Sequence, residues 1–102
     1  MSVVDTSSPL GALLHEHRDR ILEIAAHHRA RSVRVFGSVA RGDSSEKSDI
    51  DLLVDFEPDS SLFDLLHLTE ELEELLGHEV DVVSTGGLKD RDDRILAEAV
   101  DL

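Results

Sequence analysis

Residues 37–56, GSVARGDSSEKSDIDLLVDF, decide how this chain folds. In residues 49–56 acidic and apolar side chains alternate, which predicts a β-strand. Successive side chains of a strand point to opposite faces, so Asp49 and Asp51 share one face. Residues 37–48 are predicted to form a loop with one helical turn at its start. A strand carrying two carboxylates thus follows a turn rich in glycine and serine.

The carboxylate pair is costly unless a cation lies beside it. Like charges a few ångströms apart disfavour each other's ionisation, and Mg²⁺ prefers oxygen ligands. Asp81 lies in a short apolar segment, residues 79–83, which we expect to form a strand beside Asp49 and Asp51 and so to supply a third ligand. The alternative from the pattern alone is that Asp49 and Asp51 face solvent on a half-exposed sheet.

Gly37 and Ser38 directly follow a predicted strand, residues 32–36. Glycine lets backbone N–H groups approach an anion and a serine hydroxyl adds a donor, so the pair forms either a phosphate cradle or a simple turn. A phosphate cradle beside a carboxylate pair would supply both halves of a metal–nucleotide site. Arg41 either reaches a phosphate or makes a surface or partner contact.

The rest of the chain predicts a single α/β (α+β) domain over residues 1–102 with a small sheet. Apolar spacing predicts one helix from Pro9 to about Arg29 and another over residues 62–76, which starts at a Ser61–Asp64 capping box and ends at Gly77. A last helix is expected over residues 88–100. The predicted inward face of the middle helix consists of Leu62, Leu65, Leu66, Thr69, Leu72 and Leu76.

The composition of the chain argues against several classes of function. The chain has 102 residues, a formal net charge of −13, no cysteine and 3% aromatic residues. Cysteine chemistry is excluded, and the negative charge disfavours binding to phosphate backbones, so we expect no direct nucleic-acid partner. No apolar run approaches a membrane span and no basic leader precedes one, so we expect no membrane partner and a cytoplasmic location. Histidines of the first helix lack i, i+4 spacing, so no metal site is predicted there.

The stretch from Gly37 to Phe56 resembles the Gly-Ser, spacer, Asp-x-Asp signature of the DNA polymerase beta-like nucleotidyltransferase superfamily. It is most similar to the minimal nucleotidyltransferases, the MNT-type antitoxins that are paired with HEPN-domain toxins. The similarity extends over residues 62–76, over Gly77-His-Glu-Val-Asp-Val82 and over residues 88–100. The resemblance implies a nucleotidyltransferase fold, in which a small mixed β-sheet of about three strands is flanked by helices.

The resemblance also implies a reaction. Asp49, Asp51 and Asp81 would hold two Mg²⁺ ions. Asp81 would also lie near the incoming hydroxyl and act as the base. Gly37 and Ser38, with Arg41 nearby, would bind the phosphates of ATP. AMP would be transferred to a tyrosine hydroxyl of the HEPN toxin, an RNase, and so neutralise it within a hetero-oligomer of the two proteins.

Two other readings remain open. In one, the protein is a non-catalytic binding module that blocks the same partner by covering it. In the other, the acceptor is a small molecule. The three carboxylates together with Gly37 and Ser38 favour the enzyme, because a module without catalysis has no physical reason to keep acidic side chains together in a sheet.

Overall fold

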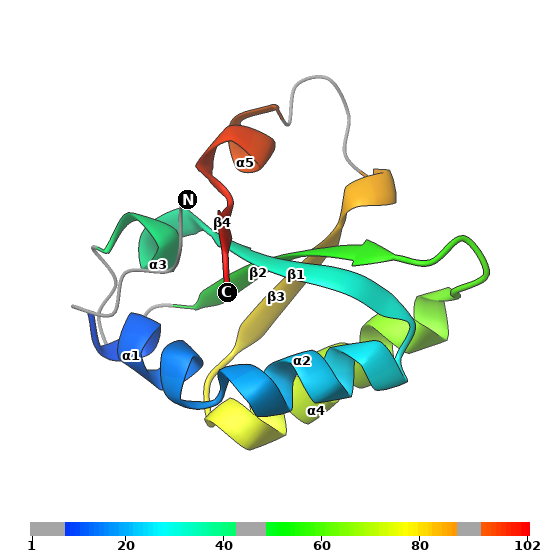
Figure 1. Ribbon diagram of the computed structural model, residues 1–102, viewed down its shortest axis with the longest axis horizontal. Helices are drawn as coiled ribbons and strands as arrows, with labels where there is room; N and C mark the ends of the chain where they lie inside the picture. Colours follow the sequence, from blue (N-terminus) through cyan, green and yellow to red (C-terminus); the bar gives the residue numbers. More distant parts are fainter. Residues whose placement is uncertain (1–7, 43–48, 88–92) are drawn as a thin grey trace.

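The computed structural model describes residues 8–42, 49–87 and 93–102, and these form helices packed on a sheet (Figure 1). The helices are α1 (Pro9–Glu16), α2 (Arg18–His27), α3 (Gly37–Arg41), α4 (Leu62–Leu76) and α5 (Asp93–Glu98), with one 3₁₀ turn at Thr85–Gly87. The strands are β1 (Ala30–Phe36), β2 (Ile50–Phe56), β3 (Val80–Ser84) and β4 (Val100–Asp101).

The sheet has the order β3-β2-β1-β4. Strand β1 pairs antiparallel with β2 and with β4, whereas β2 pairs parallel with β3. The predicted mixed sheet flanked by helices is therefore confirmed, with four strands where about three were expected. Strand β4 is too short to give an alternating pattern, and the last predicted helix covered its first residue, Val100.

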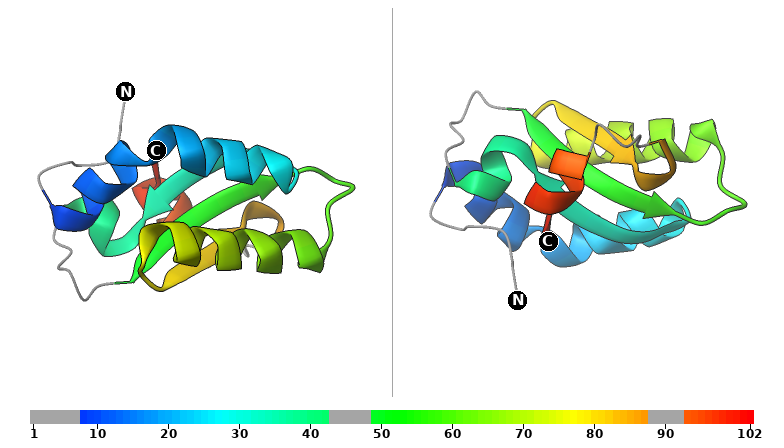
Figure 2. Two further views of the ribbon diagram at one scale, coloured as in Figure 1. Left: turned by 90° about the horizontal axis from the view of Figure 1, so that it is seen from below. Right: turned by 90° about the horizontal axis from the view of Figure 1, so that it is seen from above.

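The core lies between the sheet and the helices α1, α2 and α4, which cover one of its faces (Figure 2). Strand β2 turns Ile50, Leu52 and Val54 into this core, all fully buried. Leu53 points to the opposite face and is also fully buried. Helices α3 and α5 lie on that second side of the sheet (Figure 2). Both faces of the middle of β2 are thus covered.

The first predicted helix is two helices. Helix α1 ends at Glu16, and His17, with φ −101° and ψ 14°, separates it from α2. The break lets Leu14 of α1 and Ile21 of α2 pack into the same core, although the two helices run in different directions (Figure 1). The prediction of one continuous helix was wrong because periodicity reports which residues are buried and not whether the helix axis bends.

Helix α4 has the predicted ends, but its inward face is different. The Ser61 amide donates to Asp64 Oδ2 at 2.9 Å, as expected of the capping box, and Gly77 ends the helix with φ +69°. Leu68, Leu72 and Leu76 are the buried leucines. By contrast, Leu62 and Leu66 of the predicted inward face are 69% and 46% exposed. In a helix this rich in leucine, several faces have suitable spacing and packing selects one.

At the C-terminal end, part of the last predicted helix, residues 88–92, lies outside the described residues. The remainder forms α5 and then β4, whose Val100 and Asp101 pair with Val35 and Arg34. Within the described parts of the chain, no helix is long and apolar enough to cross a membrane.

Leu52→Ala tests the central role of β2 in the core. Because Leu52 is fully buried, the truncation should leave a cavity and lower the free energy of unfolding by about 2–5 kcal/mol in urea denaturation. The control, Leu96→Ala on α5, truncates a side chain that is 42% exposed and should change stability by less than about 0.5 kcal/mol. Equal effects of the two variants would contradict this description of the core.

Candidate functional site

Two of the three predicted acids lie side by side. In the parallel β2–β3 pair, Asp51 is the register partner of Asp81, and neighbouring strands lie about 4.8 Å apart. Both side chains are on the sheet face opposite to Leu52, because Leu52 is next to Asp51 in the strand. Asp49 precedes β2 and is exposed, Asp81 is exposed and Asp51 is half-buried.

Gly37 lies directly against this pair. The register of β1 with β2 pairs Phe36 with Asp51, so the chain leaves β1 at the level of that carboxylate. Gly37 has φ +75°, and a Cβ atom built on it would clash with Asp51 Oδ2. Both the positive φ and the missing side chain therefore require glycine at this position. Ser38 follows it in the first turn of α3 and is half-buried.

Electrostatic repulsion acts on Asp51. Partial burial and the negative charges of Asp81 and Asp49 raise the pKa of the Asp51 carboxyl above its ordinary value. The positive charge of Arg41 acts in the opposite direction but has a smaller effect. Asp49, Asp81 and Arg41 therefore all lie close enough to Asp51 to act on its carboxyl. A cation placed among the three carboxylates would relieve the repulsion.

Arg41, at the end of α3, has a partner that sequence reasoning missed. Its Nη1 atom donates to Glu98 Oε2 of α5 at 3.3 Å. This contact joins two helices on the same side of the sheet (Figure 2). The two residues are 57 positions apart and no motif includes Glu98, so only the fold could show it.

The donor set suits a hard divalent cation, because it consists of carboxylate oxygens. A cation beside Asp51 would also favour the ionised form of this carboxyl, whose pKa is raised. No three His, Asp or Glu side chains within residues 8–42, 49–87 and 93–102 are already arranged around one metal position. The assignment of Asp49, Asp51 and Asp81 as metal ligands, and of Gly37, Ser38 and Arg41 as nucleotide-binding residues, stays a prediction.

Sequence comparison matches residues 15–101 to the model of the nucleotidyltransferase domain family. A Methanocaldococcus jannaschii protein named "putative protein adenylyltransferase" is 44% identical over 90 residues, which are 87% of this chain and 97% of the relative. The protein adenylyltransferase MntA of Thermococcus cleftensis is 40% identical over 84 residues, 82% of each chain.

Structure comparison agrees. A solved structure described as a "putative minimal nucleotidyltransferase" matches with a TM-score of 0.79 and 49% identity, over 87% of this chain and 92% of that one. An MNT antitoxin in complex with a tri-AMPylated Shewanella oneidensis HEPN toxin matches with a TM-score of 0.65 over 85% of this chain and 69% of that one. The second pair is 16% identical, so this match shows the shared fold.

Gly37→Ala and Gly77→Ala separate close packing from backbone strain. Both glycines have positive φ, but nothing lies within 4 Å of a Cβ at Gly77. We expect Gly77→Ala to cost about 1–2 kcal/mol of unfolding free energy from strain alone. Gly37→Ala should cost about 2–4 kcal/mol, because the new methyl group also displaces Asp51. Equal losses in urea denaturation would show that Asp51 does not crowd Gly37.

Asp51→Asn tests the cost of ionising Asp51, to which burial and the repulsion by Asp81 and Asp49 both contribute. The pKa of Asp51 is raised in the folded state, so ionised Asp51 destabilises the fold at neutral pH, and this penalty disappears as the pH falls through the folded-state pKa. In metal-free buffer the variant should therefore have a higher Tm than wild type at pH 7, with a smaller difference at acidic pH. Glu57→Gln, which changes an exposed loop acid, is the control. A lower Tm for Asp51→Asn at pH 7 would contradict the repulsion.

Proposed function

The chain belongs to the nucleotidyltransferase domain family, and from this premise we propose that it is a protein adenylyltransferase of the MNT antitoxin type. It transfers AMP from ATP to a tyrosine hydroxyl of a HEPN-domain toxin and thereby neutralises the toxin. The observation that carries the proposal is the placement of Asp51 beside Asp81, with Gly37 against the Asp51 carboxylate.

Asp49, Asp51 and Asp81 are the residues that hold Mg²⁺ in this proposal. Mg²⁺ bound there neutralises charge on the triphosphate and on the three carboxylates. The contribution of the protein is position, because β2 and β3 fix Asp51 and Asp81 at one level of the sheet. Asp49 lies at the open end of β2 and can approach a bound ion from solvent.

Gly37 and Ser38 bind the phosphates. Gly37 lets the chain turn into α3 beside the Asp51 carboxylate, and the Ser38 hydroxyl in the first turn of α3 is a donor for a phosphate oxygen. Arg41 contributes positive charge on the same side of the sheet, and its contact with Glu98 holds the guanidinium near α5. The triphosphate would thus lie between α3 and the carboxylates of β2 and β3.

The transfer itself is an in-line displacement at the α-phosphorus. The tyrosine oxygen forms a bond to that phosphorus, the bond to the β-phosphate oxygen breaks, and pyrophosphate leaves. Asp81 is exposed beside Asp51, so an acceptor hydroxyl can reach it from solvent, and its carboxylate takes the phenolic proton.

Support for the partner comes from two sources. The MNT antitoxin complex with the AMPylated HEPN toxin has the same fold, and the curated relatives are named as protein adenylyltransferases. A net charge of −13 is also compatible with docking on the basic surface of an RNA-cutting protein.

The test is intact mass spectrometry of a candidate HEPN-domain partner, after incubation with the purified protein, ATP and Mg²⁺. We expect the HEPN protein to gain one or more AMP units, and the gain to disappear with chelator. Asp49→Asn combined with Asp51→Asn should slow the transfer by at least about 100-fold. Glu57→Gln, in the exposed loop after β2, is the matched control and should transfer at the wild-type rate.

Two outcomes would contradict the proposal. Unchanged transfer by the double variant would show that the carboxylate pair is not the site. A stable complex that silences the HEPN protein without any gain in mass would instead indicate a non-catalytic binding module.

A further inference from the structure

The contact between Arg41 and Glu98 joins two segments that both begin or end beside the candidate site. The chain leaves β1 at Gly37, forms α3 and reaches Arg41 at the end of that helix. Glu98 is the last residue of α5, and the chain then enters β4, where Val100 pairs with Val35 of β1. Both segments are therefore anchored at the C-terminal end of β1, and the Arg41–Glu98 contact ties them together a second time.

Helix α3 needs such a second anchor. It has only five residues, and a helix of this length is not stable by itself. Its start is fixed by the close packing of Gly37 against Asp51, and its middle by Val39, which is fully buried. Its end is held where Arg41 Nη1 donates to Glu98 Oε2 at 3.3 Å. Glu98 thus contributes to fixing the helix that carries the predicted phosphate-binding residues.

Stability alone accounts poorly for a glutamate at position 98. A carboxylate at the C-terminal end of a helix is unfavourable, because the last carbonyl groups carry partial negative charge. The last turn of α5 contains no basic residue that would offset this charge. The side chains of Arg41 and Glu98 are 50% and 32% exposed, and ion pairs with this exposure contribute little to the free energy of unfolding. A role in the candidate site explains the residue better.

Arg41 lies within reach of the candidate site while Glu98 holds it. Its positive charge acts on the Asp51 carboxyl, whose pKa it lowers against the effects of burial and of the other acids. An arginine side chain loses much conformational freedom when a ligand fixes it, so a contact that orders it beforehand favours binding. The guanidinium has five N–H donors, and donation to Glu98 is therefore compatible with donation to a phosphate oxygen.

We propose that Glu98 is a positioning residue, which directs the Arg41 guanidinium toward the triphosphate of bound ATP without itself touching the nucleotide. The inference rests on the proposed function, because it requires ATP as the substrate. The direction of its effect separates it from a simple charge effect. Glu98 and the triphosphate are both negative, so charge alone would make ATP bind more tightly after Glu98→Gln. Positioning of Arg41 predicts weaker binding.

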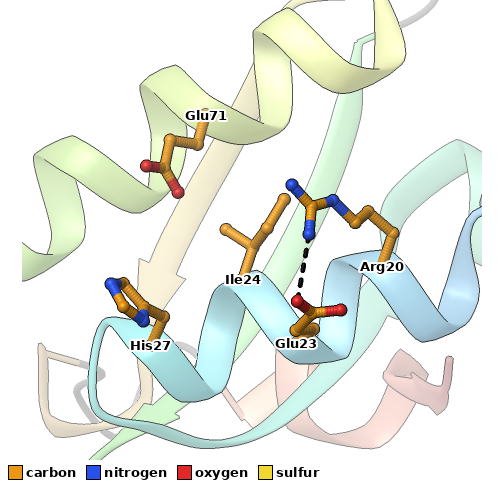
Figure 3. A pocket seen from close by; sticks show the side chains of 5 residues that line it. All are labelled: Arg20, Glu23, Ile24, His27 and Glu71. Atoms are coloured by element: carbon orange, nitrogen blue, oxygen red, sulfur yellow. Dashed lines mark hydrogen bonds and ion pairs between the residues drawn. The ribbon is translucent and has the colours of Figure 1, made fainter.

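A second Arg–Glu pair provides a matched control. Arg20 Nη1 donates to Glu23 Oε1 at 3.1 Å on α2, in the wall of a pocket of about 260 Å³ between α2 and α4 (Figure 3). This pair lies on the other side of the sheet from α3 and α5 (Figure 2). Its two residues belong to one helix, so it ties no separate elements together. Glu23→Gln removes the same charge and the same kind of contact and should leave ATP binding unchanged.

The test measures the dissociation constant of the fluorescent analogue mant-ATP with Mg²⁺ for the full chain, without a protein acceptor. Arg41→Gln should weaken binding about tenfold, as expected for the loss of a charged hydrogen bond. Glu98→Gln should weaken it about three- to tenfold. In the double variant, Glu98→Gln should add no further loss, because its effect passes through Arg41. The Tm of Glu98→Gln should stay within about 4 °C of wild type, since the pair is half exposed.

The outcomes distinguish failure of this inference from failure of the proposed function. Wild type that does not bind mant-ATP would contradict both. Binding by wild type that Glu98→Gln leaves equal or makes tighter would overturn the role of Glu98 alone. The same conclusion would follow if Arg41→Gln bound as wild type does, or if Glu98→Gln weakened binding equally in the Arg41→Gln background. A much larger fall in Tm would show that Glu98 supports the fold instead.

Discussion

The parallel register of β2 with β3 is the constraint on which the site depends. It places Asp51 beside Asp81, and the antiparallel register of β1 with β2 places Gly37 against the same carboxylate. A shift of one residue in either pairing would turn the acidic side chains into the apolar core. Ile50, Leu52 and Val54 prevent such a shift, because their full burial fixes which face of β2 points inward. Core packing thus determines the position of side chains that contribute nothing to the core.

The two faces of the sheet have different roles. Helices α1, α2 and α4 bury the apolar face and give the domain its stability, whereas α3 and α5 flank the face that carries the acids. Burial, together with the charges of Asp81 and Asp49, raises the pKa of Asp51, so the cost of the arrangement falls on this carboxyl. Carboxyl groups with a raised pKa are typical of functional sites, because such a group does not stabilise the folded protein in the absence of a ligand.

Much of the fold could be predicted from the sequence, and the exceptions have physical reasons. The alternation in residues 49–56 located β2 because alternation is a local pattern, whereas it was the resemblance to the nucleotidyltransferase signature that indicated a common site for Gly37, Asp51 and Asp81. The break at His17, the inward face of α4 and strand β4 could not be predicted. Each depends on contacts between distant residues: α1 and α2 converge on one core, Leu68 rather than Leu66 meets it, and Val100 pairs with Val35. The Arg41–Glu98 contact is of the same kind.

We propose that a divalent cation binds at Asp49, Asp51 and Asp81, although α4 carries more carboxylates. Paramagnetic broadening of backbone amide resonances by substoichiometric Mn²⁺ tests it directly, because broadening falls off steeply with distance from the ion. The claim predicts that the amides of Gly37, Asp51 and Asp81 broaden first and that Asp51→Asn greatly weakens this effect. Broadening that begins at Glu70 and Glu74, while those three amides stay sharp, would contradict it.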